Sequence, residues 1–310
     1  MTSDPAGERG FIDALRAIAR DPAARRLTDD AAVLPMPSAE SLVLTHDMLV
    51  EGVHFLPTDP PADVAWKLLA VNLSDLAAKG ASPVGVLMGY GLTGDAAWDA
   101  AFVAGLGAAL AAFAVPLLGG DTVAQPPGDA RVLGLTALGA GGLVVPGRGG
   151  AQAGDMLYVT GTIGDAGAGL AIARGEPGAA ALLAAYRRPQ PRLAEGRALA
   201  SLVHAMMDVS DGLLIDAERL AAASGLAVEI DLAAVPLSDA LRARGDDRGA
   251  RLAAAIAGDD YELLFALPPG PPPPVAATAV GRFAAGAGLT LVDGGATVPL
   301  PARLGYLHGR

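Results

Sequence analysis

Hydrophobic and polar positions along the first half of the chain follow two periods. Apolar residues recur every three or four positions in GFIDALRAIA (10–19), in PADVAWKLLAVNLSDLAAKG (61–80) and over about 96–114, which predicts three helices. Runs of β-branched and apolar residues predict strands in SLVLTHDMLVEGVHF (41–55, bent near 48–51), VGVLMGYGL (84–92), VPLLGGDTV (115–123, with a turn) and RVLGLTALGAG (131–141). These elements predict an α+β domain that ends near residue 145.

Strands and helices alternate in the second half, after the Gly-rich polar stretch 142–155. Alternation of this kind is typical of an α/β layer. The predicted strands are 156–161, 205–210, 226–232 and 261–267, and the predicted helices are 164–175, 192–204 and 211–225, the last ending at Gly225. LPPGPPPP (267–274) cannot form a helix and is interpreted as a surface loop. We therefore expect two domains, residues 1–145 and 146–310.

Composition narrows the class of protein. The 310 residues carry a net charge of −11, which argues against binding to nucleic acid or to an anionic membrane. The absence of Cys excludes disulfides, iron–sulfur clusters and thiolate catalysis. MTSDPAGERG lacks the apolar core of a signal peptide. The uncharged stretch 100–120 is long enough to span a membrane, but Pro116 interrupts it, which favours a buried helix followed by a strand. We expect a soluble, cytoplasmic protein.

Acidic residues provide the candidate chemistry. In MMDVSDGLLI (206–215), Asp208 and Asp211 stand among apolar residues, and no Lys or Arg occurs between Arg197 and Arg219. A buried carboxylate is unfavourable unless it is paired or bound to a metal. Singly, each such residue is better explained as a helix cap or a turn residue. Caps and turns explain less well why so many aspartates stand alone among apolar and small residues. The other aspartates in such surroundings are Asp29, Asp30, Asp47, Asp75, Asp121, Asp259 and Asp260.

Oxygen ligands of this kind suit Mg²⁺, which commonly bridges to substrate phosphates. A zinc site is not indicated, because the chain has no Cys and no H-E-x-x-H. No G-x-x-x-x-G-K-[ST] loop is present either. The candidate phosphate contacts are the backbone N–H groups of GGDT (119–122) and TGTIGD (160–165), together with Arg148 in PGRGG. An ordinary surface arginine is an equally good explanation of Arg148.

Eight sequence blocks, in order, resemble those of the thiamine-monophosphate kinase family. They are DDAAVL, THDMLVEGVHFLP, KLLAVNLSDLAAKGASP, GGDT, GDMLYVTGTIGD, YRRPQPR, MMDVSDGL and GDDYELLF, and they extend over about residues 11–306. The resemblance implies an α+β, two-domain fold similar to aminoimidazole ribonucleotide synthetase. The N-terminal α+β domain would form a β-barrel with that of a second copy in a homodimer, and the C-terminal domain would be α/β. The implied reaction is in-line phosphoryl transfer from ATP to thiamine monophosphate, assisted by several Mg²⁺ ions.

The same resemblance implies roles for individual residues. The implied metal ligands are Asp30, Thr45, His46, Asp47, Asp75, Asp121, Asp208 and Asp211, of which Asp47, Asp121 and Asp211 would be catalytic. The implied nucleotide contacts are Gly120, Asp121, Arg148 and Ser210, and the implied contacts to thiamine monophosphate are His54, Asp259, Arg303 and Tyr306.

Four positions depart from the family pattern. Thr28 stands where the family usually has Gly, and His46 stands where the family, with Ser-Thr-Asp or Thr-Thr-Asp at positions 45–47, has Thr. Asp259 replaces a Glu that is one methylene longer. Arg303 occupies the place of an aromatic residue that stacks on thiamine, and Tyr306 is close enough in sequence to substitute for it.

The implied chemistry requires no general base. The nucleophile would be a phosphate oxygen, whose second pKa of about 6 leaves it largely ionised at neutral pH. The difficulty is the meeting of two polyanions, which Mg²⁺ and positioning overcome. Two alternatives stay open: another ATP-dependent enzyme of the same superfamily, or a non-catalytic sensor or scaffold that binds Mg²⁺ and nucleotide. Consumption of ATP on addition of thiamine monophosphate distinguishes the kinase from the non-catalytic sensor or scaffold.

Overall fold

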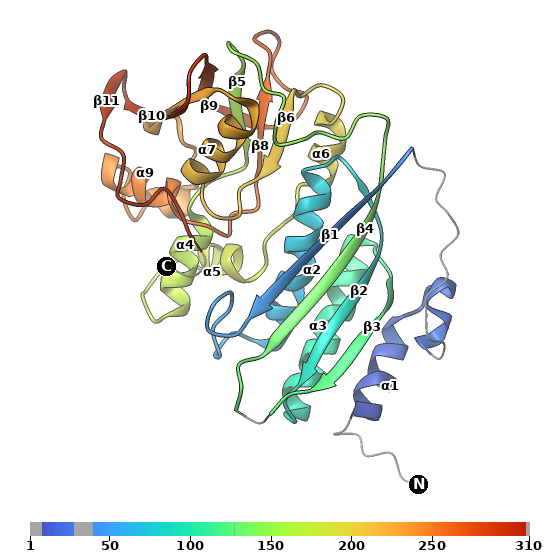
Figure 1. Cartoon of the computed structure of the whole chain (residues 1–310). Helices are drawn as coiled ribbons and strands as arrows, with labels where there is room; N and C mark the ends of the chain where they lie inside the picture. Colours follow the sequence, from blue (N-terminus) through green and yellow to red (C-terminus); the bar gives the residue numbers. More distant parts are fainter. Residues whose placement is uncertain (1–7, 28–39, 127, 308–310) are drawn as a thin grey trace. The chain divides into compact units, whose positions relative to one another are not determined.

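The computed structural model describes residues 8–27, 40–126 and 128–307 (Figure 1). Two compact units make up the chain. The first comprises residues 1–76 and 82–141, and the second comprises residues 77–81 and 142–310. Asp29 and Asp30, which the sequence singled out, and Thr28 lie outside the described residues.

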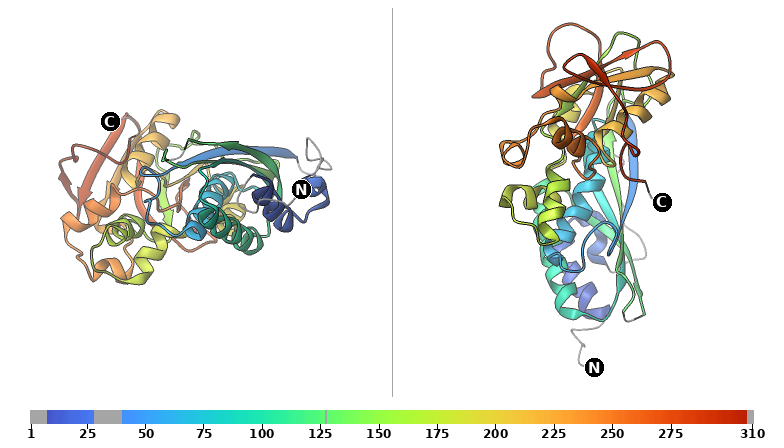
Figure 2. Two further views of the ribbon diagram at one scale, coloured as in Figure 1. Left: turned by 90° about the horizontal axis from the view of Figure 1, so that it is seen from below. Right: turned by 90° about the vertical axis from the view of Figure 1, so that its left-hand side faces the viewer.

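The first unit is a four-stranded sheet with helices on one face (Figure 2). The strand order is β1-β4-β2-β3; β4 pairs antiparallel with β1 and with β2, and β2 and β3 are parallel. The strands are β1 (Ser41–Val50), β2 (Ser82–Leu92), β3 (Leu117–Ala124) and β4 (Val132–Gly141). The helices are α1 (Glu8–Ile18), the 3₁₀ turn η1 (Pro22–Leu27), α2 (Pro61–Ala77) and α3 (Ala96–Phe113). All four strands predicted in this half are confirmed, although β1 ends at Val50 and a turn occupies 51–55.

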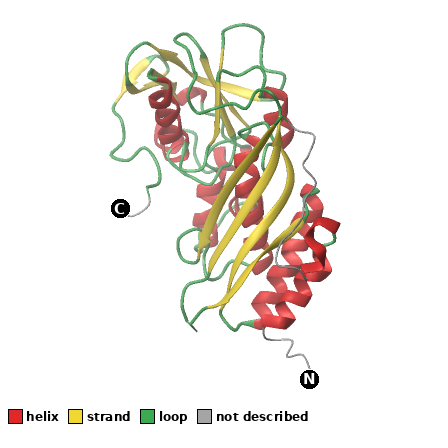
Figure 3. Cartoon of the chain, turned by 45° about the vertical axis from the view of Figure 1, so that its right-hand side comes forward, coloured by secondary structure: helices red, strands yellow, loops and turns green. Residues whose placement is uncertain are grey.

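Strict alternation along β1 separates the two faces of this sheet. Leu42, Leu44 and Met48 are 48%, 60% and 49% exposed, whereas residues 43, 45, 47 and 49 face the helices. Figure 3 shows this uncovered face in front of the helices. Within the described residues the sheet is open, with β1 and β3 at its edges. Among these residues there is no closed sheet, and the barrel that the resemblance implies would require a second copy of the chain.

Helix α3 belongs to the layer that covers this sheet. By length and composition it is the one helix among the described residues that is apolar enough to cross a membrane. Asp95 caps its first turn by accepting the Trp98 N–H, and Phe102 and Leu106 are fully buried. Asp99 is also buried and accepts a hydrogen bond from the Tyr90 hydroxyl at 2.6 Å. The helix predicted over 96–114 and the strand after it are thus confirmed.

The second unit contains a seven-stranded sheet in the order β11-β10-β7-β9-β5-β8-β6. Of its described pairs, only β7–β10 is parallel. The alternation of strands and helices suggested an α/β layer, but the sheet is mixed and mainly antiparallel. Its strands are β5 (Met156–Thr160), β6 (Ala205–Asp208), β7 (Ala227–Asp231), β8 (Leu263–Leu267), β9 (Ala277–Ala284), β10 (Gly288–Asp293) and β11 (Ala296–Val298).

Helices cover both faces of the second sheet. On one face, α7 contributes Leu214, Ala217 and Leu220 to the core, and each buried leucine stabilises the fold by about 1.5–3 kcal/mol. On the other face, Phe265 packs with Leu199 and with residues 77–78. Helix α7 ends at Gly225, which adopts the left-handed conformation that the sequence predicted. The helices are α4 (Asp165–Ala173), α5 (Ala180–Arg187), α6 (Leu193–Leu199), α7 (Leu213–Ser224), η2 (Leu232–Ala234), α8 (Asp239–Arg242) and α9 (Arg248–Ala255).

Candidate active site

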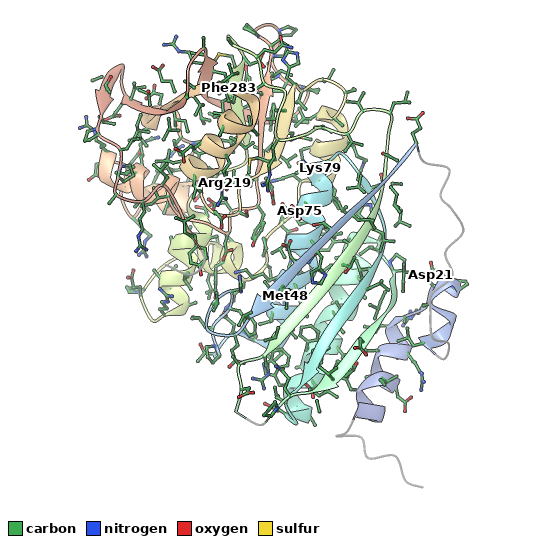
Figure 4. The ribbon with its side chains drawn as sticks, viewed as in Figure 1. Asp21, Met48, Asp75, Lys79, Arg219 and Phe283 are labelled. Carbon is green, nitrogen blue, oxygen red and sulfur yellow. The ribbon has the colours of Figure 1, made fainter. Side chains whose placement is uncertain are left out.

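In the first unit, β1 and α2 bring two carboxylates together. Thr45 and Asp47 lie on the helix-facing side of β1, two residues apart. The Thr45 hydroxyl donates a short hydrogen bond to Asp75 Oδ2 on α2. One turn earlier on that helix, Asn72 Oδ1 accepts the Asp47 N–H at 2.9 Å. Residues 72 and 75 of α2 therefore fix the segment of β1 that carries Asp47 (Figure 4, with Asp75 labelled).

The electrostatics of this pair favour a bound cation. Burial, and then the charge of Asp75, raise the pKa of Asp47 to about 6. In the part of the chain that the structure describes, neither carboxylate has an ion-pair partner. The donors are two carboxylates and one hydroxyl, all of them oxygen, which is the donor chemistry that Mg²⁺ prefers. Thr45, Asp47 and Asp75 therefore fit the metal that the sequence implied.

His46 and Asp121 lie on the other face of the same sheet. His46 is exposed, and its Nδ1 lies 2.9 Å from Thr136 Oγ1 on β4. Asp121 lies on the edge strand β3, opposite Gly89 of β2. It is exposed, and its carboxylate accepts the Thr122 N–H at 2.9 Å. The structure thus does not bring the His46 imidazole or the Asp121 carboxylate together with Asp47, because neighbouring strand residues point in opposite directions.

Gly120 is required by the close approach of two strands. It pairs with Met88, and its φ is +154°. A Cβ at this position would lie 1.9 Å from the Met88 carbonyl oxygen, so any other residue would displace the strand. The GGDT segment, which the sequence suggests as a phosphate contact, is therefore part of an exposed edge strand whose pairing with β2 requires glycine at position 120.

His54 lies in the turn that follows β1. The Val50 N–H donates to His54 Nδ1 at 3.0 Å, and Lys67 Nζ donates to the His54 carbonyl oxygen at 3.0 Å. Lys67, on α2, is only 2% exposed. Lys67 is not among the site residues that the sequence predicts. The only available signal was that it is one of two lysines in the chain and lies in a predicted helix.

In the second unit, two loops form the candidate site. Asp208, at the end of β6, is 4% exposed and begins the first loop, 208–212. The second loop, 258–262, runs beside it. Asp259 N–H donates to the Ser210 carbonyl at 2.8 Å, and Tyr261 N–H donates to the Val209 carbonyl at 2.8 Å. A Cβ on Gly258 would lie 2.6 Å from the Ser210 carbonyl oxygen, so glycine permits this close approach.

The second loop holds Asp259 in an unusual backbone conformation. Asp259 and Tyr261 have φ values of +70° and +52°, which non-glycine residues rarely adopt. Between them, Asp260 accepts the N–H groups of Gly164 at 2.8 Å and Ala166 at 3.4 Å, at the start of α4. Burial of its carboxylate raises the pKa of Asp260 well above the usual range. The contacts of Asp260 hold the backbone of the loop next to Asp259, whose carboxylate accepts the Tyr261 hydroxyl at 3.1 Å.

An ion pair between Glu262 and Arg192 also stabilises the second loop, at its C-terminal end. The Arg192 guanidinium bonds both carboxylate oxygens of Glu262, at 2.6 and 2.5 Å. The Thr160 hydroxyl donates to the same carboxylate at 2.6 Å. This pair is not among the site residues that the sequence predicts. A single Glu inside the apolar run YELLF was a signal, but nothing in the sequence identified Arg192 as its partner.

Asp211, Tyr306 and Arg148 are placed by backbone contacts in this unit. The Tyr306 N–H donates to the Asp211 carbonyl at 2.9 Å, which brings the C-terminal segment to the first loop. Arg303, three residues earlier, is exposed. The Met206 N–H donates to the Gly147 carbonyl at 2.8 Å, so Arg148 lies beside β6 with its side chain exposed. Tyr306 is thus held directly against Asp211.

Candidate oxygen donors are divided between the two units and do not form one cluster. Among the described residues, no group of three His, Asp or Glu side chains is close enough to hold a metal ion. Each unit instead presents oxygen donors in small sets. The first unit offers Thr45, Asp47 and Asp75, and the second offers Asp208 and Asp211.

Family models match both units. The N-terminal domain of AIR synthase related proteins matches residues 28–140, and the C-terminal domain matches residues 152–293. The hydrogenase maturation protein HypE of Escherichia coli has a similar fold, with a TM-score of 0.78 at 20% identity over 96% of this chain and 98% of that one. That similarity concerns the fold alone.

Relatives with higher identity define the family. The chain is 42% identical over 316 residues to the thiamine-monophosphate kinase of Caulobacter vibrioides, covering 95% of this chain and 88% of that protein. The thiamine-monophosphate kinase of Stenotrophomonas maltophilia K279a superposes with a TM-score of 0.80 at 35% identity, over 94% and 98% of the two chains. AaThiL complexed with AMPPCP and TMP gives a TM-score of 0.77 at 31% identity, over 99% of both chains. The chain therefore belongs to the thiamine-monophosphate kinase family.

Proposed function

We propose that this protein is an enzyme that transfers the terminal phosphate of ATP to thiamine monophosphate, yielding thiamine diphosphate and ADP. The observation that carries this proposal is similarity along the whole chain to thiamine-monophosphate kinases. It includes a relative complexed with AMPPCP and TMP that aligns with 99% of this chain. A superfamily member with another substrate is less well supported, because the match to HypE is only 20% identical.

The carboxylates of each unit are proposed to ligate Mg²⁺. Thr45, Asp47 and Asp75 supply oxygen donors in the first unit, and Asp208 and Asp211 supply them in the second. Asp30 and Asp121 are retained as proposed ligands from the resemblance, although Asp121, like the exposed His46, lies on the sheet face opposite Asp47. When bound, Mg²⁺ neutralises phosphate charge and orients the reacting groups. Asn72 and Thr45 keep Asp47 and Asp75 in place for this role.

The remaining site residues bind and orient the two substrates. Gly120, Arg148 and Ser210 are proposed nucleotide contacts, and Arg148 supplies a cation that no described carboxylate neutralises in an ion pair. His54, Asp259, Arg303 and Tyr306 are proposed contacts for thiamine monophosphate. The attacking phosphate oxygen is already ionised near neutral pH, so these residues position it and need not remove a proton.

A second copy of the chain is proposed to cover the open sheet face of the first unit. Leu42, Leu44, Met48 and Val123 are each at least 48% exposed on this face. An exposed apolar face of this kind is typical of an interface, and closing the sheet against its copy would remove two strand edges. We further propose that the homodimer is cytoplasmic and binds neither nucleic acid nor membranes, in keeping with its net charge of −11.

ADP release tests the proposed reaction. The purified protein is incubated with ATP and Mg²⁺, with and without thiamine monophosphate. Release that requires both Mg²⁺ and thiamine monophosphate is expected, and Asp47→Asn serves as the inactive control. Mg²⁺-dependent binding of ATP without ADP release would instead favour the non-catalytic sensor or scaffold.

A further inference from the structure

Asp216 holds the loop that carries the candidate ligand Asp211. It lies in the first turn of α7 and is completely buried. Its Oδ2 accepts three successive backbone N–H groups, from Ser210 at 3.1 Å, Asp211 at 3.0 Å and Gly212 at 3.3 Å. One carboxylate oxygen thereby fixes the path of the whole loop before the helix begins.

Arg219 links this buried carboxylate to Asp211. Its Nη1 donates to Asp216 Oδ1 at 2.8 Å and to Asp211 Oδ2 at 2.5 Å. The side chains of Arg219 and Asp211 are 35% and 23% exposed, so solvent reaches Asp211 but not Asp216. Both oxygens of Asp216 are occupied by protein donors, which leaves Asp211 as the carboxylate that can bind a ligand. Figure 4 labels Arg219 on α7.

We propose that Arg219 is a positioning residue: it holds Asp211 Oδ2 so that Oδ1 is presented to the divalent cation that accompanies the nucleotide. This inference rests on the proposed function and extends it to a residue with no assigned role. A metal-ligating carboxylate is commonly oriented by a hydrogen bond to its other oxygen, and loss of that bond weakens metal binding by about 10–100-fold. Asp216 in turn fixes Arg219, because the two residues are three apart on one helix face.

The opposite role for Arg219 would be to compete with the metal ion for the Asp211 carboxylate. A guanidinium paired with Asp211 could neutralise the carboxylate until a metal displaces it. Removal of Arg219 would then tighten metal binding, whereas removal of a positioning residue weakens it. A purely structural role predicts a third result, a lower melting temperature with unchanged metal affinity. The three roles therefore differ in the sign of a single measured quantity.

Mn²⁺ is the probe, titrated calorimetrically into the full-length protein saturated with the non-hydrolysable analogue AMPPCP. Arg219→Met is expected to raise the Kd for Mn²⁺ about tenfold. Arg219→Lys keeps the charge but has a single nitrogen, and an intermediate Kd is expected. Since Arg219 acts through Asp211, Asp211→Asn combined with Arg219→Met is expected to bind Mn²⁺ no more weakly than Asp211→Asn alone.

Arg244→Met is the matched control. Arg244 lies in the same unit, is 33% exposed, and bonds Glu176 at 2.6 Å and the Pro177 carbonyl at 2.8 Å. It is expected to leave the Kd for Mn²⁺ unchanged. An unchanged or lower Kd in Arg219→Met, or additive losses in the double variant, would overturn the proposal. Wild-type ADP release is measured first, so that failure of the kinase reaction is recognised separately from failure of this inference.

Discussion

Asp75 and Asp211 occupy similar sequences but different structures. Both follow a Ser, in VNLSDLAAKGA and MDVSDGLLIDA. Asp75 lies within helix α2, whereas Asp211 lies in a loop before α7. The charged group near Asp75 is a second carboxylate, that of Asp47, whereas the charged group near Asp211 is the guanidinium of Arg219. The comparison shows that a short local match does not determine how a carboxylate is held or how its charge is balanced.

The two units therefore position their carboxylates, and balance the charge of those carboxylates, in different ways. In the first, regular elements hold Asp47 and Asp75 close together, and their charges remain unbalanced within the described residues. In the second, backbone N–H groups and Arg219 hold the loop of Asp211. Removing a charge should relieve repulsion in the first unit but remove an attractive interaction in the second. Substitutions that preserve shape can test this difference.

The largest expected effect is on turnover. Asp47→Asn and Asp211→Asn are each expected to lower kcat by at least about a hundredfold, because each removes a negative oxygen donor to Mg²⁺. Initial rates of ADP release at saturating ATP and thiamine monophosphate measure this, and circular dichroism checks the fold. Turnover at the wild-type rate under limiting Mg²⁺ would show that the substituted residue is not a ligand.

The next effect concerns thermal stability without metal. The raised pKa of Asp47, about 6 in the folded chain, means that the folded state binds more protons than the unfolded state between about pH 4 and 6. Stability therefore falls as pH rises through this window. Asp47→Asn is expected to be about 1–2 kcal/mol more stable than the wild type at pH 7.5, with the difference shrinking toward pH 4.

Asp211→Asn sharpens the comparison in the same experiment. It weakens the pairing with Arg219, and no stabilisation is expected at pH 7.5. Melting temperatures in the presence of a chelator, from pH 4 to 8, measure both variants. Equal shifts in the two variants would show that the charges in the two units are balanced alike.

A smaller effect is expected at Asp259. Asn tolerates the left-handed conformation, so Asp259→Asn should fold normally and raise the KM for thiamine monophosphate about tenfold, with a smaller change in the KM for ATP. Asp259→Ala additionally strains the backbone, and a lower melting temperature is expected. Steady-state kinetics and thermal denaturation of both variants distinguish the effect of losing the carboxylate from the effect of straining the backbone. A selective change in the KM for ATP would instead show that Asp259 contacts the nucleotide.

The smallest effect is expected at Arg303. This residue is exposed, so Arg303→Trp should leave stability unchanged and lower the KM for thiamine monophosphate about two- to threefold by stacking. Tyr306→Ala is the companion variant, because the Tyr306 backbone is bonded to Asp211. Its KM for thiamine monophosphate should rise. A large rise in KM for Arg303→Trp would show that the arginine itself makes a productive contact.

The sequence by itself determined the main elements and the family. Periodicity located the helices and strands of the first unit, and the eight motif blocks identified the family that the comparisons confirm. A strand over 41–50 also implies that His46 and Asp47 point to opposite faces, since side chains alternate along a strand. The local chain is enough for such statements because they depend only on backbone geometry.

Tertiary structure decided the rest. Strand β9 contains Ala, Gly and Arg and has no strong strand pattern, yet it pairs with β5 and β7 on its two sides. The ion pairs Arg192–Glu262 and Arg219–Asp211 join residues 70 and 8 positions apart. Sheet pairing and side-chain partners of this kind depend on which segments the fold brings together, and the free energy of each contact exists only once the distant groups meet.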